Sequence, residues 1–447
     1  MMKVFPKQIV TVLLLASQME AQARSLSADA ANNEKPGPSS RRSALVISEV
    51  LYHPVAPEDG ANLEFIEIYN SHPWWDEVGN FRIDGDVRFT FPADTRIDKS
   101  GYVVIAADPE AVKKAYGLEQ VFGPFEGRLA NSGGRLTLRN DFDAILFEVD
   151  YETRAPWPDS ADGAGHSLVL GRPSYGERDV RAWTQSDIIG GSPGRVDTPG
   201  DEPLRPLAIN EIKTNREGDT PAFVELYNHS AFEIDLSGVT LTDSIDEQKY
   251  TFAKGTTLAG GGTLAIGESA LGFEFAPDRG VIWLFNAKGN RVLDALHYRP
   301  QPDGYSLGRS VDGSAQWNHF AEVTPGQANA APFQHTVVIN EIMYNPISLD
   351  DNDEYVELHN HGDRAVDLSN WEFNDGITFT FPDMTMLPAD GYIVVAKNRE
   401  QLLAKHKGID PKLVLGNYTG TLSNRGERLL LTEPKEALHN GRAVATK

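Results

Sequence analysis

Glutamates at two repeated positions are the residues of this chain whose spacing could do chemistry. They recur in three similar segments: the first position is Glu49, Glu211 and Glu341, and the second is Glu67, Glu225 and Glu357. If the strands that carry them are neighbours, each segment brings two carboxylates close together. Two such groups repel each other unless a cation, a proton or hydrogen-bond donors intervene.

Calcium is the natural candidate cation outside a cell, because it is a hard ion that takes oxygen ligands. The loops between the two strands add carboxylates: Glu58, Asp59 and Glu64 in the first segment, and Asp350, Asp351, Asp353 and Glu354 in the third. The second segment offers Glu217 and Asp219, which predicts a weaker site. Two other interpretations stay open. The one we favour has the glutamates bound to backbone amides or arginines and the acidic loops solvated; the other is ligand contact.

A pair of adjacent tryptophans, Trp74 and Trp75, is the second unusual feature. Neighbouring residues on a strand point to opposite faces, so one of the two rings is expected to be exposed. An exposed aromatic ring can stack on a sugar or anchor a protein partner. In the alternative interpretation, one ring fills the core and the other covers the end of the domain.

One sequence match to a catalytic motif does not predict catalysis. Residues 304–308 fit G-x-S-x-G, the motif of a hydrolase nucleophile, which requires a strand that turns sharply into a helix. Here the motif follows a Pro-Asp-Gly turn and runs into an extended segment. We therefore expect Ser306 to begin a strand. With no cysteine for thiol chemistry, the sequence predicts that the chain is not an enzyme.

The elements that must position these residues also recur three times. Each segment contains two glutamate-bearing strands, a D-L-S turn in the second and third copies, an alternating strand and a strand that starts at glycine. The glutamate-bearing strands are residues 46–50, 208–212 and 338–342, followed by residues 64–70, 223–228 and 354–360. Alternation places Glu341 on the face of Ile339. Many short strands separated by turns indicate an antiparallel sandwich or barrel.

Short helices interrupt the first and third segments. The first is predicted to start at Pro109 after an Asp108 cap and to run to about Tyr116. The second is predicted to follow Asn398 and to run to about Lys407. The middle segment has no clear copy of this helix.

The ordered set V-I-N-E-I, E-x-V-E-L-x-N, D-L-S, F-T-F-P, G-Y-x-V-V and L-S-N-x-G resembles the bacterial branch of the lamin-tail domain family, over roughly residues 44–431. This resemblance implies an immunoglobulin-like sandwich. We therefore expect an all-β protein of tandem immunoglobulin-like antiparallel β-sandwiches. The resemblance does not imply a nuclear lamin, because the chain has no coiled-coil rod.

The first two segments share an ending that the third lacks. It consists of D-G-x-S-L or a close variant, a tryptophan, and then Ser192-Pro193-Gly194 or Thr324-Pro325-Gly326. The third sandwich is therefore expected to be C-terminally incomplete, either because the chain is part of a longer one, which we favour, or because a partner completes the sheet. The predicted domains are residues 44–198, 205–331 and 336–447.

The N-terminus has the pattern of a secretory signal peptide. Lys3 and Lys7 precede an apolar run over residues 9–16, and Ala21-Gln22-Ala23 is a small-x-small cleavage site. We expect cleavage after Ala23, a signal peptide of residues 1–23, a flexible linker of residues 24–43, and no later membrane span. The formal net charge of −23 argues against nucleic acid as a partner.

These features predict a secreted, non-catalytic binding or structural protein that mediates extracellular or cell-surface interactions with proteins or glycans. Domains similar to lamin tails also occur in exported proteins beside hydrolase, nuclease or spore-coat-kinase-like domains. The alternative is therefore the non-catalytic N-terminal portion of a larger exported enzyme. The sequence does not indicate an oligomeric state.

Overall fold

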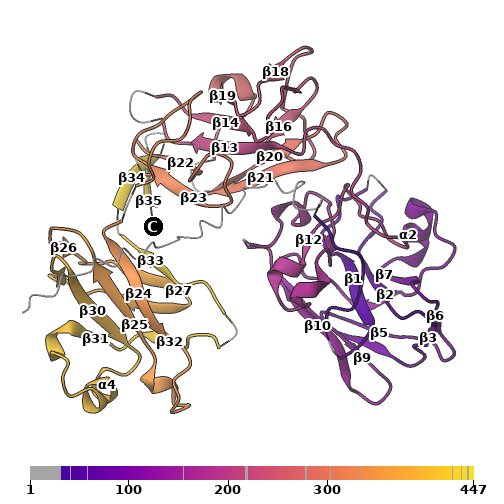
Figure 1. Ribbon diagram of the computed structural model, residues 1–447, viewed down its shortest axis with the longest axis horizontal. Coiled ribbons are helices and arrows are strands. Elements are labelled where there is room, and N and C mark those ends of the chain that lie inside the picture. The colour runs from indigo at the N-terminus through magenta and orange to yellow at the C-terminus, as the bar shows by residue number, and fades with distance from the viewer. Residues whose placement is uncertain are drawn as a thin grey trace, which may run out of the picture.

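The chain folds into three β-sandwiches that follow one another in sequence (Figure 1). The computed structural model describes residues 32–447 except 41, 58, 155, 217–219, 277–278, 303, 334, 425, 434, 440–441 and 447, and only the backbone within residues 435–446. The predicted signal peptide and the start of the predicted linker lie outside the described residues. The prediction of tandem immunoglobulin-like sandwiches is confirmed.

The first sandwich packs two five-stranded sheets around one apolar core. One sheet has the order β12-β11-β1-β2-β7, and the other has the order β10-β9-β4-β5-β8. The first sheet contains β1 (Leu45–Leu51), β2 (Phe65–Asn70), β7 (Tyr102–Ala106), β11 (Leu168–Val169) and β12 (Thr184–Gln185). The second contains β4 (Arg82–Gly85), β5 (Val87–Thr90), β8 (Glu126–Gly127), β9 (Gly134–Arg139) and β10 (Ile145–Tyr151). A small ribbon joins β3 (Asp76–Glu77) to β6 (Arg96–Ile97).

The second sandwich repeats this plan with fewer strands. Its first sheet, ordered β19-β14-β13-β22-β23, contains β13 (Leu207–Lys213), β14 (Phe223–Asn228), β19 (Thr263–Gly267), β22 (Ser306–Arg309) and β23 (Trp317–Phe320). Its second sheet, ordered β17-β16-β20-β21, contains β16 (Thr240–Thr242), β17 (Tyr250–Thr251), β20 (Gly280–Phe285) and β21 (Val292–Tyr298). A ribbon pairs β15 (Ile234–Asp235) with β18 (Thr257–Leu258).

The third sandwich has two four-stranded sheets, and β24 lies at the edge of one of them. The order β24-β25-β30-β31 comprises β24 (Val337–Met343), β25 (Tyr355–Asn360), β30 (Gly391–Ala396) and β31 (Val414–Gly416). The order β32-β28-β27-β33 comprises β27 (Glu372–Asp375), β28 (Ile377–Thr380), β32 (Thr419–Gly420) and β33 (Leu430–Thr432). Two ribbons pair β26 (Val366–Asp367) with β29 (Met386–Leu387), and β34 (Lys435–His439) with β35 (Arg442–Thr446).

The helices lie close to their predicted positions. Helix α2 (Pro109–Tyr116) has the predicted bounds, with Asp108 accepting from the Ala111 amide and Gly117 in the left-handed conformation. Helix α4 (Arg399–Lys405) ends two residues earlier than predicted, because the chain leaves helical geometry at His406. The second sandwich has the one-turn helix α3 (Glu268–Leu271) where no clear helix was expected. Short 3-10 turns complete the structure: η1 (Asp159–Ala161), η2 (Pro173–Tyr175), η3 (Val180–Ala182), η4 (Asp351–Asp353) and η5 (Pro411–Leu413).

A buried asparagine closes the second strand of every sandwich. In β14, Asn228 Nδ2 donates to the carbonyls of Phe232 (2.8 Å), Leu258 (3.1 Å) and Ala259 (3.1 Å), while Oδ1 accepts from the Ser230 amide (2.9 Å). Asn70 and Asn360 make the corresponding bonds. One side chain therefore satisfies backbone groups of two separate turns, which explains why the strand ends in asparagine.

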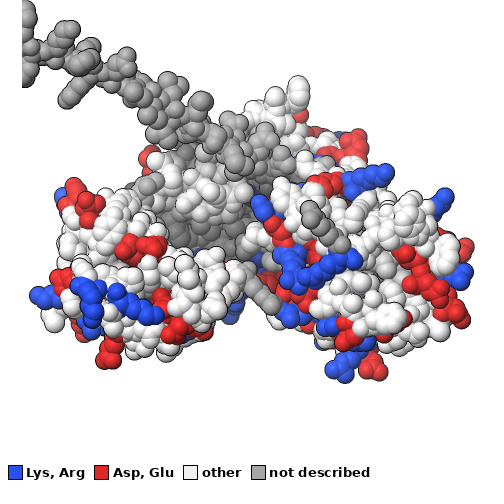
Figure 2. All heavy atoms as spheres, turned by 60° about the horizontal axis from the view of Figure 1, so that its bottom comes forward, with Lys and Arg blue, Asp and Glu red and all other residues white. Residues whose placement is uncertain are grey.

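The described part of the chain contains no helix long and apolar enough to cross a membrane. On the face drawn in Figure 2, acidic and basic side chains are interspersed over the sandwiches. The net charge of −23 is thus not gathered into one acidic patch on that face.

Candidate functional site

The repeated glutamates face each other across the first two strands of every sandwich. Glu49 of β1 is the direct partner of Glu67 of β2, and the same register pairs Glu211 with Glu225 and Glu341 with Glu357. Directly opposed residues project from the same face of a sheet. The prediction that each repeat brings two carboxylates together is confirmed.

A β-bulge just before the first glutamate decides which face it occupies. The register shifts between Ile47 and Glu49, and again at the matching positions of the other two sandwiches. The extra residue reverses the alternation, so Ile339 pairs with Leu358 on the core side while Glu341 pairs with Glu357 on the opposite side. The prediction that Glu341 shares the face of Ile339 is therefore wrong.

In the first sandwich both carboxylates are buried and receive hydrogen bonds from protein donors. Glu49 accepts from the Ser167 hydroxyl (2.5 Å), the Ser192 amide (2.9 Å) and the Ser192 hydroxyl (3.3 Å). Glu67 accepts from the hydroxyl of the bulge residue Ser48 (2.6 Å) and from the Gly194 amide (2.6 Å). Each glutamate side chain has donors at both carboxylate oxygens.

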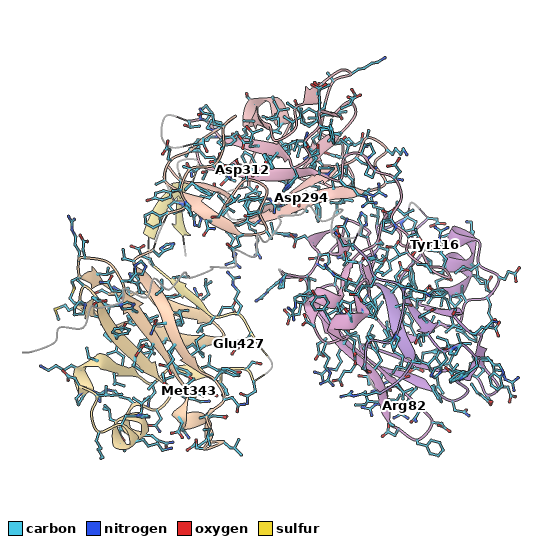
Figure 3. All side chains as sticks on the ribbon, in the orientation of Figure 1. Arg82, Tyr116, Asp294, Asp312, Met343 and Glu427 are labelled. Atoms are coloured by element: carbon cyan, nitrogen blue, oxygen red, sulfur yellow. The ribbon has the colours of Figure 1, made fainter. Side chains whose placement is uncertain are left out.

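The second sandwich makes the same contacts with different residues. Glu211 accepts from the Ser306 hydroxyl (2.5 Å) and from the amide (3.4 Å) and hydroxyl (3.3 Å) of Thr324. Glu225 accepts from the Gly326 amide (2.6 Å) and from Nδ2 of the bulge residue Asn210 (2.9 Å). Asn210 also donates to Asp312, which is labelled together with Asp294 in Figure 3.

The S/T-P-G turn therefore acts as a clamp over the glutamate pair in both sandwiches. Its first residue caps the glutamate of the first strand, and its glycine amide caps the glutamate of the second strand. Gly194 and Gly326 have φ values of 83° and 77°, which favour glycine over residues with a Cβ atom. The proline between the two amide donors restricts the backbone there, which helps to fix the spacing of these donors.

Burial changes the proton affinity of these carboxyl groups. Burial, and next the charge of Asp197, raises the pKa of Glu49 to about 8. Burial, and next the charge of Glu49, raises the pKa of Glu67 well above its usual value. In the second sandwich, burial raises the pKa of Glu225 to about 7. The raised pKa values thus reflect the cost of burying two neighbouring carboxylates.

The third pair has the same register but an open environment. Glu341 accepts from the Tyr355 hydroxyl (2.7 Å), and Glu357 accepts from Nδ2 of the bulge residue Asn340 (2.8 Å). Both hydrogen bonds are exposed. Among the described residues, no serine hydroxyl or S/T-P-G turn donates to this pair.

Comparison with a protein family agrees with this repeated geometry. Residues 202–299 and residues 330–446 match the model of the Lamin Tail Domain family. The protein contains tandem lamin tail domains. No curated protein gives a significant match to the chain.

The two matched segments are the second and third sandwiches, which are named the second and third lamin tail domains. The first sandwich lies outside these segments but shares the strand pairing and the clamped glutamate pair of the second lamin tail domain. The match to that domain ends at residue 299, before β22, β23 and the clamp turn. The clamp turn therefore lies outside the matched segment.

Two further predicted site residues, Glu64 and Glu354, hold a different turn. Glu64 is buried and accepts from the Leu129 amide (3.1 Å), and Glu354 accepts from the Leu422 amide (3.1 Å). The corresponding position in the second lamin tail domain is Ala222, and that domain has no clear copy of the turn. In the sequence, the glutamate is present in the two repeats that have this turn and absent from the repeat that lacks it. Sequence analysis instead interpreted Glu64 and Glu354 as candidate metal ligands.

The structure does not test calcium binding, which stays a prediction. The described residues contain no group of three or more acidic or histidine side chains that could together hold a metal ion. Asp350 and Asp353 are bonded to Gln401, and Asp353 also pairs with Lys405. Glu58, Glu217 and Asp219 lie outside the described residues. The buried glutamates accept hydrogen bonds from backbone amides, which agrees with the interpretation that the sequence analysis favoured.

Both tryptophans of the predicted ligand site are exposed. Trp74 is 57% exposed and Trp75 is 50% exposed. They precede the two-residue strand β3, so the alternation of a strand does not apply to them. The alternative in which one ring fills the core is wrong.

Ser306, the serine of the G-x-S-x-G match, begins strand β22 as predicted. Its side chain is fully buried, and its hydroxyl donates to Glu211. This residue therefore has a structural partner in place of the histidine that a nucleophilic serine requires.

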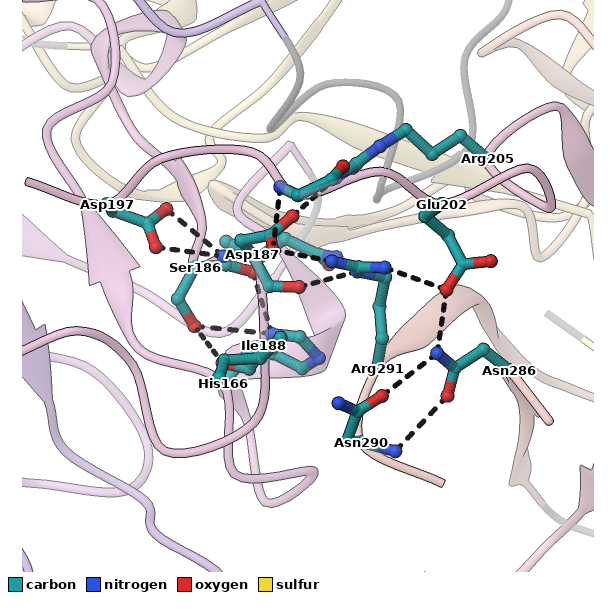
Figure 4. A network of polar contacts seen from close by, with 12 residues as sticks. His166, Ser186, Asp187, Ile188, Asp197, Glu202, Arg205, Asn286, Asn290 and Arg291 are labelled. Carbon is teal, nitrogen blue, oxygen red and sulfur yellow. Dashed lines mark hydrogen bonds and ion pairs between the residues drawn. The ribbon is translucent and has the colours of Figure 1, made fainter. Parts of the chain in front are cut away.

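A buried polar network joins the first sandwich to the second lamin tail domain, and sequence reasoning missed it (Figure 4). Arg291 Nη2 lies 2.5 Å from Asp187 Oδ2, and Arg291 Nη1 lies 2.7 Å from Glu202 Oε2. Burial raises the pKa of Asp187, but hydrogen bonds from Arg205 and Gly200 and the charge of Arg291 hold it below its usual value. All three side chains of this Arg291 network are less than 10% exposed.

His166 completes the same junction. Its Nδ1 lies 2.9 Å from the Ser186 carbonyl and its Nε2 accepts from the Val292 amide (3.0 Å), so the proton is on Nδ1. Burial lowers the pKa of His166 to about 4. An apolar cluster around Ala164, Trp283 and Phe285 adjoins it. One feature of the sequence could have indicated this junction: the first repeat has His166 where the second repeat has Tyr305.

Proposed function

We propose that this protein is an exported, non-catalytic interaction protein that binds extracellular or cell-surface proteins or glycans. Lamin tail domains are β-sandwich modules with binding or structural roles. The glutamates, Ser167 and Ser306 contribute to sandwich packing, which supports a non-catalytic role. The N-terminal Lys3, the apolar run and the Ala21-Gln22-Ala23 site support export.

The exposed tryptophan pair carries this proposal. Trp74 stacks on His72 with 4.6 Å between ring centroids, and the Arg96 guanidinium lies 4.4 Å from the centre of the Trp75 ring. These contacts hold two large aromatic surfaces in place before any partner arrives. Because less side-chain freedom is lost on binding, rigid exposed rings are effective contact residues.

The surroundings of the tryptophans favour a glycan. A shallow groove beside them is lined by Arg42, Ser43, Ala44, Leu45, His72, Asp76, Glu77, Phe81 and Leu146. Carboxylates such as Asp76 and Glu77 can accept hydrogen bonds from sugar hydroxyls, while an aromatic face stacks on the apolar side of a sugar ring. Asp76 is also fixed by His72, whose Nδ1 lies 2.7 Å from Asp76 Oδ2.

Binding of the full chain to arrayed glycans and to isolated cell envelopes tests the proposal. We expect Trp74→Ala and Trp75→Ala each to weaken binding by about tenfold, which corresponds to about 1.4 kcal/mol. Phe142→Ala is the matched control, because this ring is 85% exposed at the turn between β9 and β10. Undiminished binding by the double tryptophan variant would remove the proposed site.

The export proposal has a separate test. The protein recovered from its own cells is expected outside the cytoplasm with Arg24 as its first residue, as intact-mass and N-terminal analysis would show. A cytoplasmic protein that retains residues 1–23 would contradict it.

A further inference from the structure

The free edge of β24 in the third lamin tail domain has no described neighbour strand. The corresponding strands β1 and β13 lie inside their sheets, between β2 and β11 and between β14 and β22. Among the described strands, only β25 pairs with β24. Strand β24 ends at Met343, which is labelled in Figure 3.

Apolar side chains that are buried in the first sandwich are exposed on β24 and just after it. Val338, Ile342 and Tyr344 are 38%, 42% and 48% exposed. Their counterparts Val46, Val50 and Tyr52 are at most 2% exposed. An unpaired strand edge with exposed apolar side chains is a template for pairing with another strand.

The other two sandwiches show what covers such an edge. Strand β22 pairs antiparallel with β13, with Gly308 opposite Glu211 and Leu307 opposite Ile212. Ser306 on this strand donates to Glu211, and the clamp turn that follows donates to both glutamates. The first sandwich uses β11, Ser167 and the Ser192-Pro193-Gly194 turn in the same way.

The acceptor side of this arrangement is present in the third domain. Glu341 and Glu357 stand in the same register as the clamped pairs, and the bulge residue Asn340 donates to Glu357 as Asn210 does to Glu225. The parts not found among the described residues are the serine-bearing strand and the turn with its two amide donors.

We propose that the free edge of β24 binds an extended segment of another polypeptide that carries a serine and, further along, an S/T-P-G turn. The segment adds antiparallel to β24, its serine hydroxyl donates to Glu341, and its turn amides donate to Glu341 and Glu357. Main-chain pairing of this kind supplies affinity, and the two carboxylates select the serine and the turn. This inference deepens the proposed interaction role and rests on it.

A second copy of the chain fits this edge less well. Its own β11 and β22 are already paired within their sandwiches, and β34 pairs with β35. Two β24 edges brought together would add the glutamates of both copies to one sheet without the hydroxyl and amide donors. A heterologous donor strand supplies those donors.

Binding of a synthetic peptide to the full chain tests the proposal. The probe is a fluorescent peptide of residues 304–327, which contains β22, β23 and the Thr324-Pro325-Gly326 turn. We expect saturable one-to-one binding by anisotropy and slower hydrogen exchange of β24 amides. The Ser306→Ala peptide is expected to bind about tenfold more weakly, because it lacks the donor to Glu341.

Variants of the chain locate the binding. Glu341→Ala removes an exposed acceptor, so the domain should fold, and peptide binding is expected to fall by about tenfold or more. Glu400→Ala, which removes the same charge from the exposed first turn of α4, is expected to bind normally. Equal losses in both variants would overturn the proposal.

Three other results would also overturn it. One is a natural protein that continues beyond residue 447 and covers β24 with its own strand, as its intact mass and hydrogen exchange would show. Another is a monomeric chain that binds no peptide at all. The third is a dimer protected along β24 that the peptide does not dissociate, which would make a second copy the occupant. The Trp74 and Trp75 variants are expected to bind the peptide normally, so failure here and failure of the glycan test are distinguishable.

Discussion

The second and third lamin tail domains place the same two glutamates opposite each other and give them opposite surroundings. Glu211 and Glu225 are fully buried beneath β22 and the clamp turn, whereas Glu341 is exposed on the edge strand β24 and Glu357 is partly buried on the neighbouring β25. Register and bulge are the same in both domains. The difference shows that the strand covering a motif, and not the motif itself, decides whether its carboxylates are structural or available.

The contacts of the first sandwich with the other two domains also differ in burial. The first sandwich meets the second domain through buried ion pairs, an apolar cluster and main-chain bonds such as Ile189 amide to Asn290 carbonyl (2.9 Å). Between the first sandwich and the third domain, the ion pair is the long contact of Arg154 with Asp375 (3.5 Å), and Arg154 is 69% exposed. The first two sandwiches are thus joined by a buried interface, whereas this ion pair between the first and third sandwiches is exposed.

The largest expected effect comes from breaking the buried junction. Arg291→Ala removes the guanidinium that the buried carboxylates of Asp187 and Glu202 share, so we expect a loss of about 4 kcal/mol in the free energy of unfolding. Asn286 still donates to Glu202, and Arg205 still pairs with Asp187. Calorimetry should show the transitions of the first two sandwiches separating. Arg154→Ala at the exposed contact is the control, with an expected change below about 0.5 kcal/mol. Similar losses in the two variants would mean that the junctions do not differ.

Removing one glutamate from each kind of pair sharpens the comparison further. Glu49→Ala leaves the buried Ser167 hydroxyl and Ser192 amide without their acceptor, and we expect it to destabilise the first sandwich by about 3 kcal/mol. Glu341→Ala at the open edge is expected to change stability by less than about 0.5 kcal/mol. Chemical denaturation followed by domain-specific hydrogen exchange measures both values. Equal costs would show that burial of the pair has no energetic consequence.

The smallest effect is the pH dependence of the clamped pair. The pKa of Glu49 is raised from 4.5 to about 8, so the folded state holds more protons than the unfolded state and stability falls as pH rises through this range. The opposing trend from His166, whose pKa is lowered to about 4, operates below about pH 6.5. Between pH 6.5 and 8 the slope is therefore set by acidic groups with raised pKa values, which are Glu49, Glu67 and, up to about pH 7, Asp159.

We expect the free energy of unfolding of the first sandwich to fall in that window by up to about 1.4 kcal/mol per pH unit for each titrating group. Glu49→Gln cannot titrate at this position, so its stability should depend less steeply on pH. Thermal unfolding at pH 6.5 and 8 compares the two proteins. An identical slope in the variant, or stability that rises with pH, would contradict the assigned shift.

The sequence by itself determined the repeated architecture. The glutamate-bearing strands, the closing asparagines and helix α2 follow from local patterns of apolar residues, turn formers and caps. These features depend on neighbouring residues along the chain, and periodicity reports such local preferences well. The serine of the G-x-S-x-G match was also identified correctly as the start of a strand.

Only the tertiary structure decided what surrounds those residues. The bulge that moves Glu341 to the face opposite Ile339, the S/T-P-G clamp and the Arg291 junction all join segments far apart in sequence. Glu67 and Gly194 are 127 residues apart in the chain, and no local pattern encodes their contact. Burial, proton affinity and exposure are properties of the packed chain, so the same glutamate pair is clamped twice and open once.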